Sequence, residues 1–200
     1  MPRLVVLIPE STRKAKGGDP YLRAVDGFAD ALPKAAQDQL LGLRTEVAAT
    51  WRNTTAKDGL MPAYMRFQGN MYRRIARDAW ESRERGVEVL IASGLYGVLA
   101  SRDTVFAYPH SMAEPVPPFG KLNRWWHGRG LPGILAAYLS AAKPRTVVDL
   151  LSKEYREAIT GYADHLSGVA VKTIEFPGMG RSSQPRRGER VAEILRTGAV

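Results

Sequence analysis

The chain has no cysteine and only three histidines among its 200 residues. Without cysteine there is no disulfide framework, no thiolate zinc site and no cysteine nucleophile. The spacing of His110, His127 and His165 matches no metal-binding motif, so we expect neither a metal ion nor another cofactor. No apolar run is long enough for a transmembrane helix. The first apolar stretch, LVVLI, is too short for a signal-peptide core, which favours a cytoplasmic protein that does not enter a membrane.

Acidic residues are scarce relative to basic ones. The 29 lysines and arginines outnumber the 20 aspartates and glutamates, so the formal net charge is +9. This excess favours phosphate-rich partners, namely nucleic acid or a phosphorylated or nucleoside-like small molecule. The hydrophobic content of 44% and the length suit one globular domain over residues 1–200. The oligomeric state stays open.

The apolar pattern predicts an α/β fold, with a curved and mostly parallel sheet flanked by helices. Proline-rich residues 109–120 read as an irregular surface loop, and residues 54–61 as a loop that ends at Pro62. The predicted strands are 3–8, 87–92, 145–150 and 169–176, and the predicted helices are 21–32, 34–51, 69–85, 122–126, 132–142, 153–166 and 187–195.

The segment LIASGLYGVL marks the expected ligand site. Ser93, Gly94, Tyr96 and Gly97 directly follow the buried strand predicted over 87–92. Ligand sites of open α/β sheets lie beyond the carboxyl ends of such strands. The glycines permit a tight turn and a close backbone approach, although they also suit a turn with no further role. The segment is not a nucleophile elbow, because that motif is G-x-S-x-G.

Basic residues gather in two glycine-containing stretches. Lys14 and Lys16 precede Gly17 and Gly18, but the stretch does not match the phosphate-binding motif G-x-x-x-x-G-K-[ST]. A solvated loop is the alternative reading. The second stretch carries Arg181, Arg186 and Arg187.

Asp103 and Glu154 are the candidate catalytic carboxylates, because each follows the end of a predicted strand. A carboxylate near a bound anion weakens binding by charge repulsion, so we expect one there only if it acts on a base edge, a sugar hydroxyl or a proton. The alternative is that each forms a salt bridge with a basic neighbour.

Four motifs in one order resemble the YaaA family of peroxide-stress proteins. The central motif is SGLYGVL at residues 93–99, followed by Asp103 and by Tyr108. The others are LIPES at 7–11 with the glycine pair at 17–18, FQGNMY at 67–72, and VVDL at 147–150. The resemblance implies the fold of that family, a basic cleft that binds DNA, and a role in oxidative-stress protection. It adds these residues to the expected ligand site: Ser11, Lys14, Lys16, Tyr72, Tyr108, Ser152 and Tyr155.

The carboxyl end departs from the family pattern, because Phe176 is followed by PGMGRSS and the usual lysines are missing. Two hypotheses follow. The first is a nucleic-acid-binding protein of the YaaA type. The second is an enzyme that cleaves or exchanges the glycosidic bond of a nucleoside or nucleotide, for instance in a specialised biosynthetic pathway. A basic open surface favours the first, and a small pocket enclosing Tyr96, Asp103 and Glu154 favours the second.

Overall fold

A five-stranded sheet runs through the middle of the protein. The structure, a computed structural model, describes residues 2–51 and 59–200, so most of the loop predicted over 54–61 lies outside it. The strand order is β4-β3-β1-β8-β9, with every neighbouring pair parallel except β3 and β4. This confirms the α/β class and the mostly parallel sheet. The strands are β1 (Leu4–Pro9), β3 (Val87–Ser93), β4 (Gly97–Ala100), β8 (Thr146–Asp149) and β9 (Ala170–Thr173).

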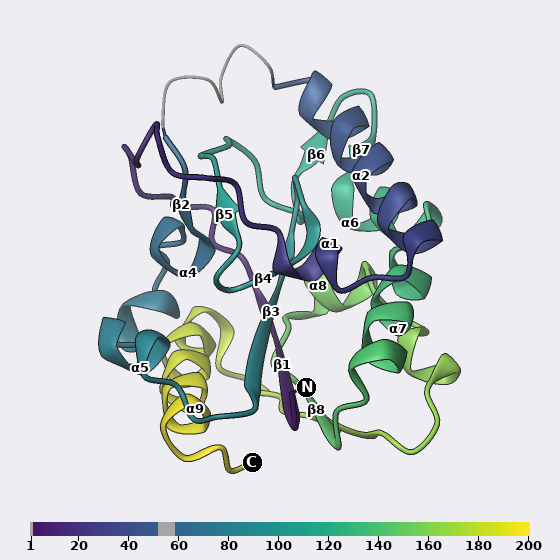
Figure 1. Cartoon of the computed structure of the whole chain (residues 1–200). Helices are drawn as coiled ribbons and strands as arrows, with labels where there is room; N and C mark the ends of the chain where they lie inside the picture. The colour runs from purple at the N-terminus through teal and green to yellow at the C-terminus, as the bar shows by residue number, and fades with distance from the viewer. Residues whose placement is uncertain (1, 52–58) are drawn as a thin grey trace.

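Helices cover both faces of this sheet (Figure 1). The carboxyl-terminal helix α9 (Ser183–Thr197) and α5 (Arg77–Glu81) lie on one side, and α2 (Lys34–Ala49), α6 (Leu122–Gly128) and α7 (Leu131–Ala142) lie on the other. Shorter helical elements are α1 (Gly27–Asp30), α4 (Ala63–Arg66), η1 (Tyr72–Arg74), α8 (Lys153–Glu157), η2 (Tyr162–His165) and η3 (Gly180–Ser182). Two small ladders pair β2 (Met61–Pro62) with β5 (Thr104–Val105), and β6 (Pro115–Val116) with β7 (Gly120–Lys121).

The central strand β1 is buried along its whole length, as its apolar sequence predicts. It pairs with β3 on one side and with β8 on the other, so that Leu7 faces Leu90 and Asp149 in the ladder. From β1 the chain proceeds to β3, whereas from β8 it proceeds to β9 at the opposite edge. The direction of winding therefore reverses between β1 and β8, and such a switch point is where open α/β sheets place their ligands.

Three predicted helices are shorter than the sequence pattern suggested. The helix predicted over 21–32 begins only at Gly27, because the Asp26 side chain caps it and accepts a hydrogen bond from Ala29 N–H. Before it, the backbone of Val25 bonds to Thr104 and leaves Val25 exposed. The helix predicted over 153–166 ends early and resumes as η2 after Gly161, whose φ of +91° is left-handed.

The helix predicted over 69–85 is wrong in extent. Its backbone is extended at Ile75 and Ala76, which separates η1 from α5. The break lets the Tyr72 hydroxyl donate to the carbonyl of Pro9, while Trp80 packs on Tyr64. Tertiary contacts therefore override the local helical pattern.

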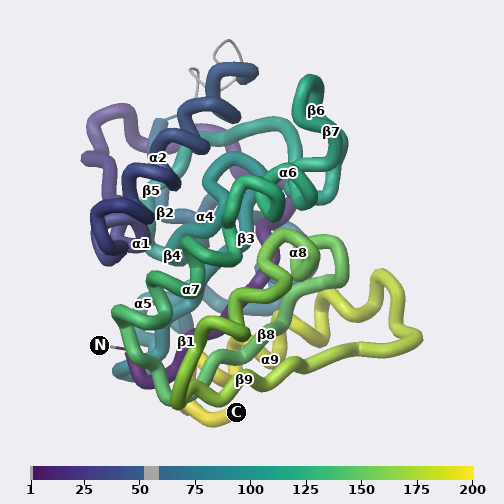
Figure 2. Tube along the Cα trace, turned by 90° about the vertical axis from the view of Figure 1, so that its right-hand side faces the viewer, coloured from purple at the N-terminus to yellow at the C-terminus, as the bar shows by residue number. Residues whose placement is uncertain are grey.

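The two ends of the described chain meet at the end of the sheet where the central strand β1 begins. A guanidinium nitrogen of Arg3 donates to the carbonyl of Gly198 at 3.4 Å. Figures 1 and 2 both place the termini at this lower end of the molecule, away from the carboxyl ends of β1 and β3.

Gly97 is the first residue of β4, directly after the turn from β3, and its φ is +67°. A Cβ there would lie 2.9 Å from the buried ring of Trp126 and 3.0 Å from Leu131. Gly97→Ala should destabilise the protein by about 2–5 kcal/mol, from ~1–2 kcal/mol of backbone strain and ~1–3 kcal/mol of overpacking.

Urea unfolding checks this expectation, and Gly120→Ala is the matched control. Gly120 also has a left-handed φ, of +70°, but a Cβ there meets nothing within 4 Å. The control should therefore show only the strain of about 1–2 kcal/mol. Equal losses in both variants would contradict the packing part of the argument.

Candidate functional site

A cavity of about 270 Å³, with polar and apolar groups in similar measure, opens beside the end of β1 and the helix that follows β8. It takes its walls from the loop after β1, the segment before η1, the loop before β6, the helix after β8 and the first turn of α9. Its position is the switch point of the sheet. The lining residues are Pro9, Glu10, Ser11, Thr12, Gly69, Asn70, Met71, Tyr72, Ser111, Ala113, Tyr155 and Gln184.

The carboxylate of Glu10 lies beneath this cavity with no exposed side-chain surface. One oxygen accepts hydrogen bonds from the N–H groups of Gly94 and Met112, each at 2.7 Å. The other accepts from the Tyr108 hydroxyl. Burial raises the pKa of Glu10, opposed by the Lys14 charge and these hydrogen bonds. Glu10 thereby joins the end of β1 to the loop after β3 and to residues 108–112.

Lys14 is the cation that accompanies Glu10. Its ammonium lies 3.7 Å from the Glu10 carboxylate and 4.0 Å from the centre of the Tyr108 ring. The side chain is only 5% exposed, and burial lowers the Lys14 pKa although Glu10 and Glu114 oppose the shift. Desolvation therefore acts on both members of the pair and disfavours the charge of each.

A chain of hydroxyl groups continues from this pair. With the Tyr108 hydroxyl donating to Glu10, the Ser93 hydroxyl donates to Tyr108 at 2.6 Å. Ser93 in turn accepts from the N–H of Tyr96 at 3.2 Å. Gly94 is required beside them, because a Cβ there would lie 2.9 Å from the nitrogen of Met112.

Two buried tyrosines form part of the cavity wall. Tyr72 donates to the carbonyl of Pro9 at 2.9 Å, and Tyr155 hydrogen-bonds to Ser111. Burial raises the pKa of both phenols well above the ordinary value, so both stay neutral hydrogen-bonding groups. The wall offers hydroxyl, amide and backbone groups and suits a polar, uncharged part of a ligand.

Arg66 fixes the loop that follows β1 by hydrogen bonds to its backbone carbonyls. This fully buried side chain donates to the carbonyls of Ala15, Gly17 and Gly59, at 2.6, 3.1 and 2.6 Å. The backbone of Arg13 also bonds to Gln68 in the segment before η1. The loop around Lys14 is thus a built part of the structure and not a free solvated loop.

The structure brings many of the predicted ligand-binding residues together. Ser11, Tyr72 and Tyr155 line the cavity. Lys14, Ser93, Gly94, Tyr96 and Tyr108 belong to the network around Glu10 beneath it. Their roles toward a ligand stay predictions.

The lining of this cavity includes neither of the predicted catalytic carboxylates, although Glu154 directly precedes the lining residue Tyr155. Asp103 is buried at the end of β4, where it accepts hydrogen bonds from Gly27, Phe28 and Ala100 N–H groups. Glu154 is exposed at the start of α8 and accepts from the Ser152 hydroxyl at 3.1 Å. Among the described residues neither carboxylate forms the salt bridge considered as the alternative, and each side chain accepts hydrogen bonds instead. Gly97 packs on Trp126, away from the cavity lining.

The predicted basic residues have different surroundings. Lys16 and Arg181 are exposed. Arg186 is paired with Glu189 at 3.1 Å. Arg187 is buried over the ring of Phe176, and its Nε and Nη1 have no hydrogen-bond partner within residues 2–51 and 59–200.

Sequence reasoning missed Glu10, Asn70 and Gln184 as members of the site. A signal for Glu10 existed, because it is a charged residue directly after a fully apolar strand. For Gln184 there was no such signal, since only the packing of α9 brings it to the cavity.

Among the described residues, histidine, aspartate and glutamate side chains nowhere gather in a group of three or more that could hold a metal ion. Within those residues, no helix is long and apolar enough to cross a bilayer.

Glu10→Gln should destabilise the protein by about 3–5 kcal/mol, because it leaves the buried Lys14 cation without its charge partner. The double variant Glu10→Gln/Lys14→Met should lose less than the sum of the two single changes. Urea unfolding of the four proteins gives the coupling. Strictly additive losses would mean that the two charges do not interact.

Burial raises the pKa of Asp103 from 3.8 to about 6. The folded protein therefore binds more protons than the unfolded chain between these values, and stability falls as pH rises from about 4 to about 6. The Asp103 contribution to this fall should be about 3 kcal/mol. Asparagine does not titrate, so the free energy of unfolding of the wild type should fall relative to that of Asp103→Asn as pH rises over this range. Unfolding titrations of both proteins measure this. A difference that does not change with pH would refute the shift.

Comparison with known proteins identifies the chain's relatives. The family model described as peroxide stress protein YaaA matches residues 24–184. A UPF0246 protein of Idiomarina loihiensis is 30% identical over 127 residues, which cover 61% of this chain and 49% of that protein. A UPF0246 protein of Ruegeria sp. is 29% identical over 137 residues, covering 60% of this chain and 51% of the relative.

The chain thus spans about half the length of these curated relatives. The matched region contains the FQGNMY, SGLYGVL and VVDL motifs and the strands β3, β4, β8 and β9. It also contains most of the residues that line the cavity. With the family model covering well over half of the chain, the protein belongs to the YaaA family of peroxide stress proteins.

Proposed function

We propose that this protein binds nucleic acid in the cytoplasm as part of a response to peroxide stress, with the strand lying over the cavity at the switch point. The peroxide-stress part follows from family membership. The observation that carries the binding part is a set of three exposed arginines close in sequence to residues that line the cavity, named here the basic rim: Arg13, Arg73 and Arg181.

Each residue of the basic rim adjoins the cavity wall through the chain. Arg13 follows Thr12, Arg73 follows Tyr72, and Arg181 lies three residues before Gln184. Within the described residues none of the three forms an ion pair, whereas Arg77, Arg124, Arg186 and Arg190 do. Unpaired exposed guanidinium groups are available to phosphates.

The cavity is too small for a large ligand of its own. Its volume of about 270 Å³ lies below the range of ~300–1,000 Å³ found for sites of drug-sized molecules. A space of this size with neutral polar walls suits a base or a sugar, while the charged phosphates of the same strand lie on the basic rim. The net charge of +9 supports the same partner.

The alternative is an enzyme that acts on the glycosidic bond of a nucleoside or nucleotide. The cavity supports a ligand of that size, but Asp103 and Glu154 do not line it. Catalysis by those two carboxylates at this cavity therefore has no geometric support. Release of free base from a nucleoside panel by the wild type would support an enzyme that uses other groups.

Binding to a short DNA strand should weaken steeply with salt, because phosphate contacts release counterions. Replacing Arg13, Arg73 and Arg181 together by glutamine should lower the slope of log K against log salt by about 2, since each single-strand contact contributes ~0.7. Fluorescence anisotropy at several salt concentrations measures the slope.

The matched control replaces Arg85, Arg145 and Arg196 by glutamine. These arginines are also exposed and form no ion pair in the described structure, but Arg85 and Arg145 lie at the edge of the sheet where β3 and β8 begin. The control changes the net charge equally and should leave most of the slope intact. Equal effects of the two triple variants, or no binding at low salt, would refute the proposal.

A further inference from the structure

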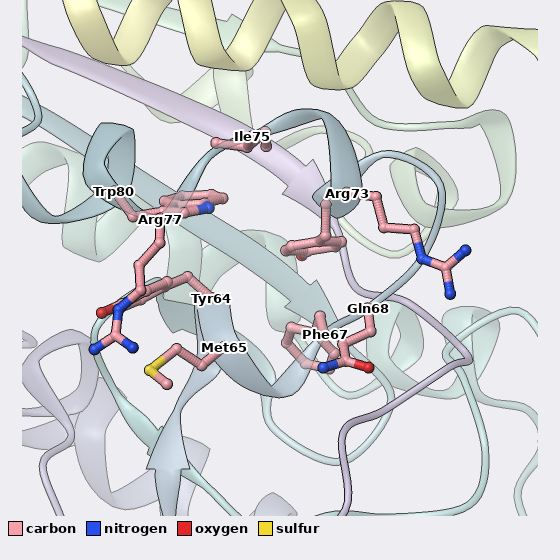
Figure 3. Close-up of a pocket in the computed structure, with 9 residues that line it drawn as sticks. Tyr64, Met65, Phe67, Gln68, Arg73, Ile75, Arg77 and Trp80 are labelled. Carbon is pink, nitrogen blue, oxygen red and sulfur yellow. The ribbon is translucent and has the colours of Figure 1, made fainter.

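A second hollow, of about 390 Å³, lies next to the cavity and has a different character. Figure 3 shows its side chains, which come from α4, η1 and α5. We call it the aromatic groove. Its residues are Tyr64, Met65, Phe67, Gln68, Tyr72, Arg73, Ile75, Arg77 and Trp80.

Near-parallel rings form the wall of the aromatic groove. Tyr64 stacks on Trp80 at 5.6 Å between centroids and 27° between planes, and Trp80 stacks on Tyr72 at 6.3 Å and 18°. Trp80 and Tyr72 are buried, whereas Tyr64 is half-buried and offers its ring to the groove. An aromatic wall of this kind favours a flat ring as the occupant.

The polar groups of the groove are at its margin. The guanidinium groups of Arg73 and Arg77 lie on opposite sides of the groove (Figure 3). That of Arg77 lies beside the Tyr64 hydroxyl, and both donate to the same oxygen of Glu81. Arg77 is held by Glu81 at 2.6 Å, whereas Arg73 forms no ion pair within the described residues. A flat ring with an attached anionic group would thus find one available cation, at Arg73.

Two connections join the aromatic groove to the switch-point cavity. Tyr72 lines both, and Gly69 of the cavity follows Gln68 of the groove. Arg73 is also a member of the basic rim. A strand with a phosphate at Arg73 would therefore have one nucleotide at the cavity and the next base within reach of the groove.

We propose that the aromatic groove receives an unpaired base, so that the preferred ligand is single-stranded and not duplex nucleic acid. This inference rests on the proposed function, and specifies the form of nucleic acid that it requires. In a duplex each base is already stacked and paired, and entry into the groove would need that base to leave the helix. A single strand has its bases free to stack on protein rings.

The test compares a short single strand, the same sequence as duplex, and a single strand with abasic sites, by fluorescence anisotropy at one low salt concentration. The single strand should bind best. Tyr64→Leu keeps an apolar side chain but removes the ring, and should weaken single-strand binding roughly 5- to 150-fold, the fold-change that corresponds to one stacked base. The abasic strand should bind the wild type and the variant equally.

Two controls test whether the effect of Tyr64→Leu comes from the loss of base stacking in the groove. Tyr21→Leu removes a tyrosine ring that is 91% exposed and lies outside the groove, and should change nothing. The salt slope should be unaffected by Tyr64→Leu, because no phosphate contact is lost, but should fall by about 0.7 in Arg73→Gln.

The outcomes separate this inference from the function on which it rests. Unchanged single-strand binding by Tyr64→Leu, or tighter binding of the duplex by the wild type, overturns the groove proposal and leaves nucleic-acid binding in place. Failure of the wild type to bind any of the three ligands overturns the proposed function and this inference together.

Discussion

The buried carboxylate of Glu10 is the constraint on which the candidate site depends. It collects hydrogen bonds from Gly94, Tyr108 and Met112, which belong to segments that are distant from it in sequence. A buried carboxylate is stabilised when its oxygens accept hydrogen bonds and a cation is close, and Lys14 supplies that cation. The end of β1, the loop after β3 and residues 108–112 are therefore fixed relative to one another by folding, and the cavity above them is set before any ligand arrives.

The central strands β1, β3 and β8 were predictable, because a parallel sheet buried on both faces leaves continuous apolar runs in the sequence. The antiparallel strand β4 was not predicted, and β9 is shorter than the strand predicted over 169–176. β1 and β3 lie within one residue of their predicted limits. The helices were less predictable. Residues 69–85 have apolar residues at helical spacing, yet the chain is extended at Ile75 and Ala76. The contacts that cause the break, from Tyr72 to Pro9 and from Trp80 to Tyr64, join residues whose proximity no local pattern reveals.

The end of the sheet at which the candidate cavity lies was also predictable, since the motif after β3 and the rule of strand ends both indicate the same end. The role of each polar residue was not. Lys14 and Arg187 read as exposed cations in the sequence, but both are buried, one beside Glu10 and the other over Phe176. Asp103 follows a strand in the sequence as a catalytic group would, but its oxygens join α1 to β4. Burial decides these roles, and it depends on the packing of the whole chain.

The hydrogen bond between Arg3 and Gly198 places both ends of the described chain on the side of the sheet opposite the cavity. An affinity tag, a fluorophore or a surface tether attached at either end would therefore leave the ligand-facing side open to solution. The same closeness of the ends makes the chain suited to circular permutation, in which a short linker joins the old termini and new ones are cut in an exposed loop.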